Sequence, residues 1–391
     1  MQADLHEFKD KGYLILRQVI PPDMLEDLRQ SFDELVRREW PEGPSPGRPP
    51  QQPRIYGFEK HIDASTANIL EFCLHDNVLD PCRQLLQVPD VGMAYMFLMC
   101  NPVRDYGPWF WHRDFTPLSD GPLQGMQLDF AANGPAHLQW NIALYDDDVL
   151  WIVPGSHTRP NTEDENRQLA AVPHTYAHNQ QPQGEKRHEP LPGSVPVDLK
   201  AGDGVVYANM LLHWGSNYST QLRRCIHMGY RGFDARSFYH NGFVCDANIT
   251  RHLSPERRAV YERLIDLYER ECNTVEAVFH AIIHRDEAGF RQGLAQLHPA
   301  ATGRLTCLIL LSKIAQRMQR DQEAEYRPRF SPEETQTLWQ RFTPLDQALR
   351  ADGEDYLPGF LIKDPVPYRI YDSPEDFDID TFVATWNGRP G

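Results

Sequence analysis

The segment Trp111-His112-Arg113-Asp114 holds the residue types best suited to metal chemistry. In an extended segment, residues i and i+2 face the same side, so His112 and Asp114 are expected to point together. Two histidines and one carboxylate on one face of an octahedron form the facial triad of non-haem iron oxygenases, which leaves positions open for a co-substrate and oxygen. The segment therefore predicts two of three metal ligands, and a second histidine has to come from a later strand.

The His-x-Asp pattern alone is permissive. It occurs three times in this chain, as His61/Asp63, His112/Asp114 and His284/Asp286. The first pair lies in a loop that leads into a predicted helix, and the last lies in a helical pattern, where residues i and i+2 do not share a face. Only the middle pair lies in a β-prone segment among aromatic residues, so it is the candidate metal site.

The segment from Ala201 to His213 supplies the second histidine. Its glycine-rich start predicts a tight turn, an apolar strand follows, and His213 ends that strand. Arg223 and Arg224 follow ten and eleven residues later. A guanidinium binds a carboxylate through two parallel hydrogen bonds, as an anionic co-substrate beside the metal would require. Adjacent strand residues face opposite sides, so only one of the two arginines is expected to enter the interior.

Other polar residues of the predicted strands have two interpretations each. Gln139 and Asn141 share a strand face, and they either contact the co-substrate or make hydrogen bonds inside the core. His137 and His227 are more simply explained as hydrogen-bonded structural residues, and Trp111 as part of the core. His157 follows a Pro-Gly-Ser turn and is expected to belong to that turn.

The elements that must position these residues divide the chain into three stretches. A short strand, a helix and a second helical stretch are expected before residue 90. Short β-prone runs separated by turn residues, from about 91 to 233, predict a barrel or sandwich, interrupted by a polar insertion at 156–198 that is either functional or disordered. After about 250 the pattern is helical, with a helix start at Ser254 and a capping box at Ser331, and the tail from Tyr356 is expected to be irregular.

Composition excludes several classes of protein. The 391 residues include 39 Lys and Arg against 55 Asp and Glu, a formal charge of −16 that disfavours nucleic acid and anionic membranes as partners. No apolar run approaches the roughly 20 residues that span a bilayer, and the N-terminus lacks the pattern of a signal peptide, so a cytoplasmic location is expected. The seven widely spaced cysteines fit neither a zinc ribbon nor a disulfide scaffold.

Four blocks together resemble the phytanoyl-CoA dioxygenase family of iron(II)/2-oxoglutarate oxygenases. They are FKDKGYLILRQVIPPDMLEDL, WHRDF, HLQWNIALYDDDVLWIVPGSH and GDGVVYANMLLHWGSNYSTQLRRCIHMGY, and they lie in the family's order over roughly residues 5–235. The resemblance implies a mainly β protein with flanking helices, built on a double-stranded β-helix (cupin-like jelly roll) core. The turn before Pro154 is shorter than the family usually has, and the C-terminal helical extension is outside the family pattern.

The resemblance also implies a chemistry. His112, Asp114 and His213 would hold iron(II), 2-oxoglutarate would bind the iron, and an arginine would bind its distal carboxylate. The family's Asn-x-Ser spacing favours Arg223 over Arg224 for that role. Oxygen would be consumed, and succinate and carbon dioxide released. The presence of Asp114 favours hydroxylation of a C–H bond over halogenation, whereas desaturation, ring formation or demethylation would use the same ligands.

The predicted organisation is an oxygenase domain over 1–250 and a helical extension over 251–391. The extension is expected to pack on the core or on a second copy of the chain, and the substrate is expected to be a small-molecule metabolite or biosynthetic intermediate. Two alternatives stay open. One is a metal-binding cupin whose chemistry does not use 2-oxoglutarate, and the other is a non-catalytic binding protein that works through the helical extension.

Overall fold

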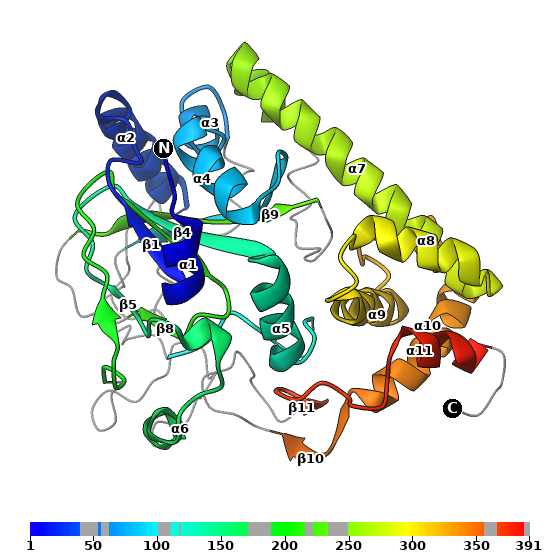
Figure 1. Ribbon diagram of the computed structural model, residues 1–391. Coiled ribbons are helices and arrows are strands. Elements are labelled where there is room, and N and C mark those ends of the chain that lie inside the picture. Colours follow the sequence, from blue (N-terminus) through cyan, green and yellow to red (C-terminus); the bar gives the residue numbers. More distant parts are fainter. Residues whose placement is uncertain are drawn as a thin grey trace, which may run out of the picture.

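Two antiparallel sheets lie at the centre of the described part of the chain (Figure 1). The computed structural model describes residues 1–39, 54–55, 62–100, 111–116, 119–170, 189–215, 222–233, 249–355 and 366–386. Helices cover one face of the larger sheet, and a group of C-terminal helices lies to one side of it. The two sheets carry the residues that the sequence singles out.

The larger sheet has six strands in the order β1-β7-β4-β9-β3-β2. Their bounds are Tyr13–Leu16 (β1), Arg54–Ile55 (β2), Val91–Cys100 (β3), His137–Ala143 (β4), Gly204–Ala208 (β7) and Arg224–Gly232 (β9). The central strand β4 pairs with β7 and β9, which places Gln139 opposite both Tyr207 and Gly229. Side chains on β4 therefore alternate between the helices outside and the second sheet inside.

The smaller sheet has three strands in the order β6-β5-β8. Their bounds are Leu150–Ile152 (β5), Val195–Pro196 (β6) and His213–Gly215 (β8). Buried apolar side chains from both sheets form one cluster, among them Leu150 and Ile152 from β5 and Val205 and Tyr207 from β7. The two sheets are thus packed face to face around this core.

Four N-terminal helices cover the outer face of the larger sheet. They are α1 (Leu5–Lys11), α2 (Pro22–Glu39), α3 (Ala67–Cys73) and α4 (Asp76–Leu86). Trp140 of β4 donates from Nε1 to Cys82 Sγ of α4 at 3.2 Å, and Tyr230 of β9 donates to the carbonyl of Cys73 at 2.6 Å. The outward-facing residues of β4 and β9 are therefore fixed against helices, and their neighbours face inward.

The C-terminal extension is a group of helices with a short hairpin (Figure 1). Its elements are α7 (Pro255–His284), α8 (Glu287–Leu297), α9 (Arg304–Arg320), α10 (Pro332–Ala348), β10 (Arg350–Asp355), β11 (Val366–Tyr368) and α11 (Ile379–Trp386). Ser254 caps α7 by accepting from Arg257 N, and Ser331 and Glu334 form the predicted capping box of α10. A buried ion pair between Arg231 of β9 and Glu271 of α7 joins the extension to the larger sheet.

The expectation of a mainly β protein is wrong for the chain as a whole. The helix α7 alone has 30 residues, whereas the longest strand, β3, has 10. Two helices inside the β-rich stretch also escaped prediction: α5 (Leu123–Asn133), which lacks a clear apolar stripe, and α6 (Glu163–Ala170), which lies in the polar insertion. The tail is not irregular throughout, because α11 forms there with Phe382 and Trp386 buried. No helix in the described ranges has the length and apolar character needed to cross a membrane.

Candidate metal centre

His112 and His213 are brought together by their backbones. They form an isolated antiparallel bridge, in which each residue's N–H donates to the other's carbonyl at 2.9 Å. The two rings consequently lie side by side, with centroids 4.3 Å apart. Residues that are 101 positions apart in the chain are therefore neighbours because the segment before Asp114 pairs with the start of β8.

Asp114 completes a group of three possible metal ligands. Its carboxylate oxygens Oδ1 and Oδ2 lie 3.3 Å from His112 Nε2 and from His213 Nε2, respectively. One ligand atom from each residue lies within 4.8 Å of the others. The segment is not a regular strand as expected: beyond the bridge at His112, the Asp114 N–H donates to the carbonyl of Asn209 at 2.9 Å. That second backbone bond still turns both side chains to the same side.

The protonation of this group suits a divalent cation. Burial alone would raise the pKa of Asp114, but the charge of His213 and the hydrogen bond and charge of His112 hold it well below its usual range. His213 Nδ1 lies 2.8 Å from the carbonyl of Leu211, so in the neutral ring the proton is on Nδ1 and the lone pair of Nε2 is open to a metal. Two imidazoles and one ionised carboxylate are a donor set that fits iron(II).

Gln139 and Asn141 face the interior, as their alternation on β4 predicts. The Gln139 amide donates from Nε2 to Asp114 Oδ2 at 2.5 Å and to the Tyr95 hydroxyl at 2.7 Å. The Asn141 Oδ1 lies 2.6 Å from His227 Nδ1. Gln139 therefore contacts a candidate metal ligand directly, whereas Asn141 belongs to a neighbouring polar pair.

Aromatic and histidine rings fill the space around Gln139. Tyr95 stacks on His137 and on His227, with ring centroids 5.6 Å and 5.4 Å apart, and Tyr207 meets His213 edge-on at 5.2 Å. Burial lowers the pKa of His137 to about 4, so this ring is neutral at pH 7. Their sequence context predicts only structural roles for His137 and His227, and no sequence pattern singles out Tyr95 or Tyr207.

The structure separates the two candidate arginines. Arg224 points outward from β9, where its Nε donates to Asp33 of α2 at 2.9 Å. Arg223 is buried and donates from Nε to Asp147 Oδ2 at 2.8 Å. By the alternation of β9, Arg223 lies on the face that carries His227, so it is the arginine that faces the interior.

Asp147 is a partner that the sequence analysis did not assign. Its carboxylate accepts from Val149 N through Oδ1 at 2.9 Å and from Arg223 through Oδ2, so both oxygens are fixed. Burial alone would lower the pKa of Arg223, but the charge of Asp147 holds it above its ordinary value. Only the run of three aspartates at 146–148 signals this residue, and nothing in that run shows which of them turns inward.

A small cavity of about 40 Å³ is lined by Asn209, a residue that contacts the candidate ligand Asp114, but not by the three candidate ligands themselves. His137 and Asn209 line it on the sheet side, and Asn209 is the residue whose carbonyl accepts from Asp114. Helix α5 contributes Asp129 and Phe130, and helix α9 of the extension contributes Thr306 and Leu310. The C-terminal extension thus lines a space that also reaches Asn209, a hydrogen-bond partner of a candidate metal ligand.

Two other residues have the structural places that the sequence analysis preferred. His157 is buried, with Nε2 3.1 Å from the carbonyl of Lys9 in α1, and burial lowers its pKa to about 4. Trp111 is also buried and packs against Trp214 with ring centroids 5.3 Å apart. The neighbouring residues 101–110 and His61 lie outside the described part of the chain.

A protein-family model for phytanoyl-CoA dioxygenase (PhyH) matches residues 8–225, more than half of the chain. The chain belongs to the phytanoyl-CoA dioxygenase family. The resemblance seen in the four sequence blocks is thereby confirmed, and the cofactors of this PhyH protein are iron(II) and the co-substrate 2-oxoglutarate. The matched range includes His112, Asp114, His213 and Arg223 and stops before the helical extension.

Solved structures similar to this PhyH protein are distant. AviO1 from Streptomyces viridochromogenes Tue57 is 20% identical, with 58% of this chain and 93% of that chain covered and a TM-score of 0.41. EctD from S. alaskensis, solved with 2-oxoglutarate and 5-hydroxyectoine, is 18% identical, with 59% and 75% covered and a TM-score of 0.40. The epimerase SnoN from nogalamycin biosynthesis is 15% identical, with 59% and 81% covered and a TM-score of 0.38. No curated protein matches at a significant level.

Proposed function

We propose that this protein is an iron(II)/2-oxoglutarate-dependent dioxygenase that hydroxylates a C–H bond of a small-molecule metabolite and releases succinate and carbon dioxide. The observation that supports it is the meeting of His112, Asp114 and His213, with ligand atoms within 4.8 Å of one another, in a chain of the PhyH family. The two packed sheets are proposed to form the double-stranded β-helix of that family.

Different residues of the centre are proposed to bind the metal, to orient its ligands and to exclude water. Bound iron(II), with 2-oxoglutarate and oxygen, supplies the oxidising power for a C–H bond. His112, Asp114 and His213 hold the metal, and the Gln139 amide fixes the orientation of the Asp114 carboxylate. The surrounding buried rings exclude water and keep the ligand side chains in one conformation.

Arg223 is proposed to bind the distal carboxylate of 2-oxoglutarate. It is inward-facing and buried, and the Asp147 carboxylate orients the guanidinium from its Nε edge. Asn141 and Gln139 are proposed as further polar contacts for the co-substrate. Arg224 is given no part in this binding, because its side chain is held at α2 on the other face of β9.

The substrate is proposed to approach through the cavity between α5 and α9. Its position beside Asn209 and His137 is close to the metal ligands, and its walls are partly polar. The helical extension would then complete the substrate site as a second domain over 251–391. Association of two copies through this extension and a cytoplasmic location remain predictions.

An anaerobic titration tests this function. Iron(II) and then 2-oxoglutarate are added to the metal-free protein, and the visible metal-to-ligand charge-transfer band is followed. We expect the band in the wild type and none in His213→Ala. In Arg223→Ala the affinity for 2-oxoglutarate should fall at least about 10-fold, since a charged bidentate contact is lost.

Arg224→Ala is the matched control, because it removes the same side chain from the opposite face of the same strand. It should bind 2-oxoglutarate like the wild type. Iron binding without a band would refute the 2-oxoglutarate chemistry and favour a cupin of another reaction type. If iron did not bind at all, a non-catalytic role of the extension would be favoured instead.

A further inference from the structure

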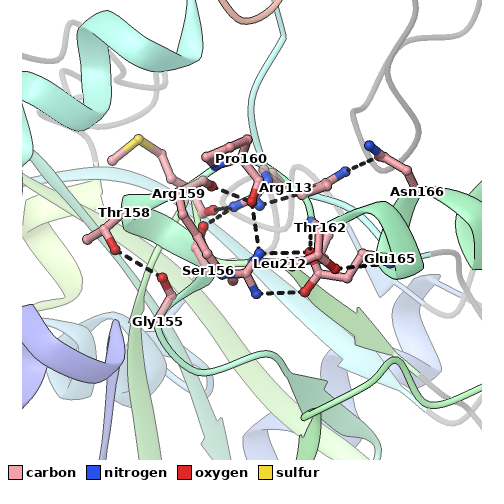
Figure 2. A network of polar contacts seen from close by, with 12 residues as sticks. Arg113, Gly155, Ser156, Thr158, Arg159, Pro160, Thr162, Glu165, Asn166 and Leu212 are labelled. Carbon is pink, nitrogen blue, oxygen red and sulfur yellow. Dashed lines mark hydrogen bonds and ion pairs between the residues drawn. The ribbon is translucent and has the colours of Figure 1, made fainter.

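Arg113 lies between the two candidate ligands in sequence and points the opposite way. Its side chain is fully buried. Its Nη1 donates to the carbonyls of Ser156, at 2.6 Å, and of Met210. Its Nη2 donates to Asn161 Oδ1 at 2.9 Å. Figure 2 shows Arg113 and Ser156 within this network from close by. One guanidinium thus donates hydrogen bonds to two other chain segments.

The segment with Met210 continues into the candidate ligand His213, and the segment with Ser156 is hydrogen-bonded to the residue before His213. Met210 precedes His213 by three residues, so the bond from Arg113 adds a further link to the His112–His213 bridge and the Asp114–Asn209 bond between the two ligand-bearing segments. Ser156 makes a further link, because its hydroxyl accepts from the N–H of Leu212 at 2.8 Å. The residue next to His112 and the residue next to His213 therefore share Ser156 as a partner (Figure 2).

The end of this network farthest from Arg113, here called the outer end, is formed by residues 159–165 at the start of the polar insertion. Arg159 binds Glu165 through two contacts of 2.8 Å and 2.7 Å, and Glu165 Oε2 accepts from Thr162 N at 2.7 Å. The Thr162 hydroxyl in turn accepts from Glu165 N at 3.2 Å. Thr162 and Glu165 thus form a reciprocal capping box at the N-terminus of α6. Asn161, which accepts from Arg113, stands immediately before this pair.

Burying the guanidinium of Arg113 is energetically costly. A buried guanidinium is unfavourable unless its N–H groups are hydrogen-bonded, and here the described acceptors are carbonyls and an amide oxygen, not a carboxylate. The hydrogen bonds of the Arg113 guanidinium can therefore be kept only if the His112 segment, the His213 segment and residues 156–166 all stay in place. A lysine has the charge but lacks the planar fork that reaches them together.

We propose that Arg113 is a positioning residue of the metal centre, which joins the His112 segment, the His213 segment and residues 156–166 into one unit. Metal loading and the order of residues 156–166 are then coupled. Because such coupling is reciprocal, weakening the outer end of the network weakens metal binding, and binding of the metal protects the outer end. This inference rests on the metal site of the proposed function.

Cobalt(II) binding to the full chain, followed by its visible absorption, tests the coupling without any turnover. Arg113→Lys should raise the dissociation constant by about 10- to 100-fold, the usual effect of losing a residue that supports metal ligands. Asn161→Ala removes one bond at the outer end and should raise it about 5-fold. Arg167→Ala is the control, since that side chain is 73% exposed on the same helix α6, and it should leave the constant unchanged.

Hydrogen exchange gives the reciprocal measurement. Amides of residues 163–170 should exchange more slowly when cobalt(II) is added to the wild type, and Asn161→Ala should abolish that protection. A purely structural Arg113 would give variants that unfold at lower temperature but bind cobalt(II) with the wild-type constant, and that result would overturn the proposal. If Arg113→Lys does not fold, the Asn161→Ala constant and its exchange pattern decide alone.

The same experiments separate this inference from the proposed function. Cobalt(II) binding with intact coupling, but no band with iron(II) and 2-oxoglutarate, would refute the oxygenase reaction and leave the coupling standing. A normal band in Asn161→Ala, with unchanged cobalt(II) affinity and exchange, would refute the coupling and leave the reaction standing.

Discussion

Removing Glu271 should destabilise the whole chain, because it leaves Arg231 buried without its carboxylate. Arg231 of β9 donates to Glu271 of α7 through Nη1 at 2.8 Å and Nη2 at 2.6 Å. The two side chains are 0% and 3% exposed. The guanidinium also lies against the rings of Phe233 and Tyr268, with 5.1 Å and 5.3 Å to their centroids, so water cannot replace the lost partner.

The expected size of the effect follows from this burial. Breaking a buried ion pair from one side costs about 3–5 kcal/mol, whereas an exposed pair contributes about 0–1 kcal/mol. We therefore expect Glu271→Gln, which keeps the shape of the side chain, to lower the unfolding free energy by about 3 kcal/mol. Replacing both partners with apolar residues of similar volume, as Arg231→Met with Glu271→Leu, should restore most of that loss.

Urea unfolding of the full chain, followed by circular dichroism, measures these changes. Arg263→Ala is the control on the same helix, since its side chain is 64% exposed and pairs with Asp90 at the surface. It should change stability by less than about 1 kcal/mol. Equal losses of stability in Glu271→Gln and Arg263→Ala, or a double replacement less stable than Glu271→Gln, would refute this role of the ion pair.

Three other perturbations test the interior, a buried histidine and the metal. In Gly229→Ala the new Cβ would lie 2.5 Å from Tyr95 Cε1, so unfolding in urea should show a loss of about 1–3 kcal/mol, and a wild-type midpoint would contradict the packing. The folded pKa of His157 is about 4, below its unfolded value of about 6.5. The unfolded state therefore binds more protons in this range, and stability should fall as pH drops from about 6.5 to 4, by at most about 1.4 kcal/mol per pH unit for this group. His157→Phe should flatten that part of a thermal-melt pH profile, and an unchanged slope would contradict the assignment. Cobalt(II) at 100 times its dissociation constant should stabilise the wild type by about 2.7 kcal/mol in thermal melts but not Asp114→Ala, and equal shifts in both would exclude Asp114 as a ligand.

The parts of the site that depend on chain order and alternation could be predicted. His112 and Asp114 share a side, and Gln139 and Asn141 share the inner face of β4. Both follow from the period of two in extended backbone, which is a local property of the sequence. The helix starts at Ser254 and Ser331 were predictable for the same reason, because a cap lies within a few residues of the groups it satisfies.

The partners that the site gains across strands could not be predicted. Asp147 meets Arg223 over 76 positions of sequence, and Tyr95 reaches Gln139 from a strand that is irregular between Met93 and Tyr95. A register shift of this kind moves side chains to the other face, and no local pattern reports it. Pairings of this sort depend on how distant strands align, so they become visible only in the folded chain.

The choice between Arg223 and Arg224 shows how the register of one strand links the proposed 2-oxoglutarate site to the helical extension. Because β9 is regular alongside β4, the face that carries His227 also carries Arg223 and Arg231. A slip of one residue would turn Arg224 inward and would at the same time turn Arg231 away from Glu271. That slip would leave Glu271 buried without its partner, and it is therefore unfavourable by several kcal/mol. The ion pair with α7 thus stabilises the register that places Arg223 inside, and the extension, although it lies beyond the family match, supports the position of the arginine proposed to bind 2-oxoglutarate.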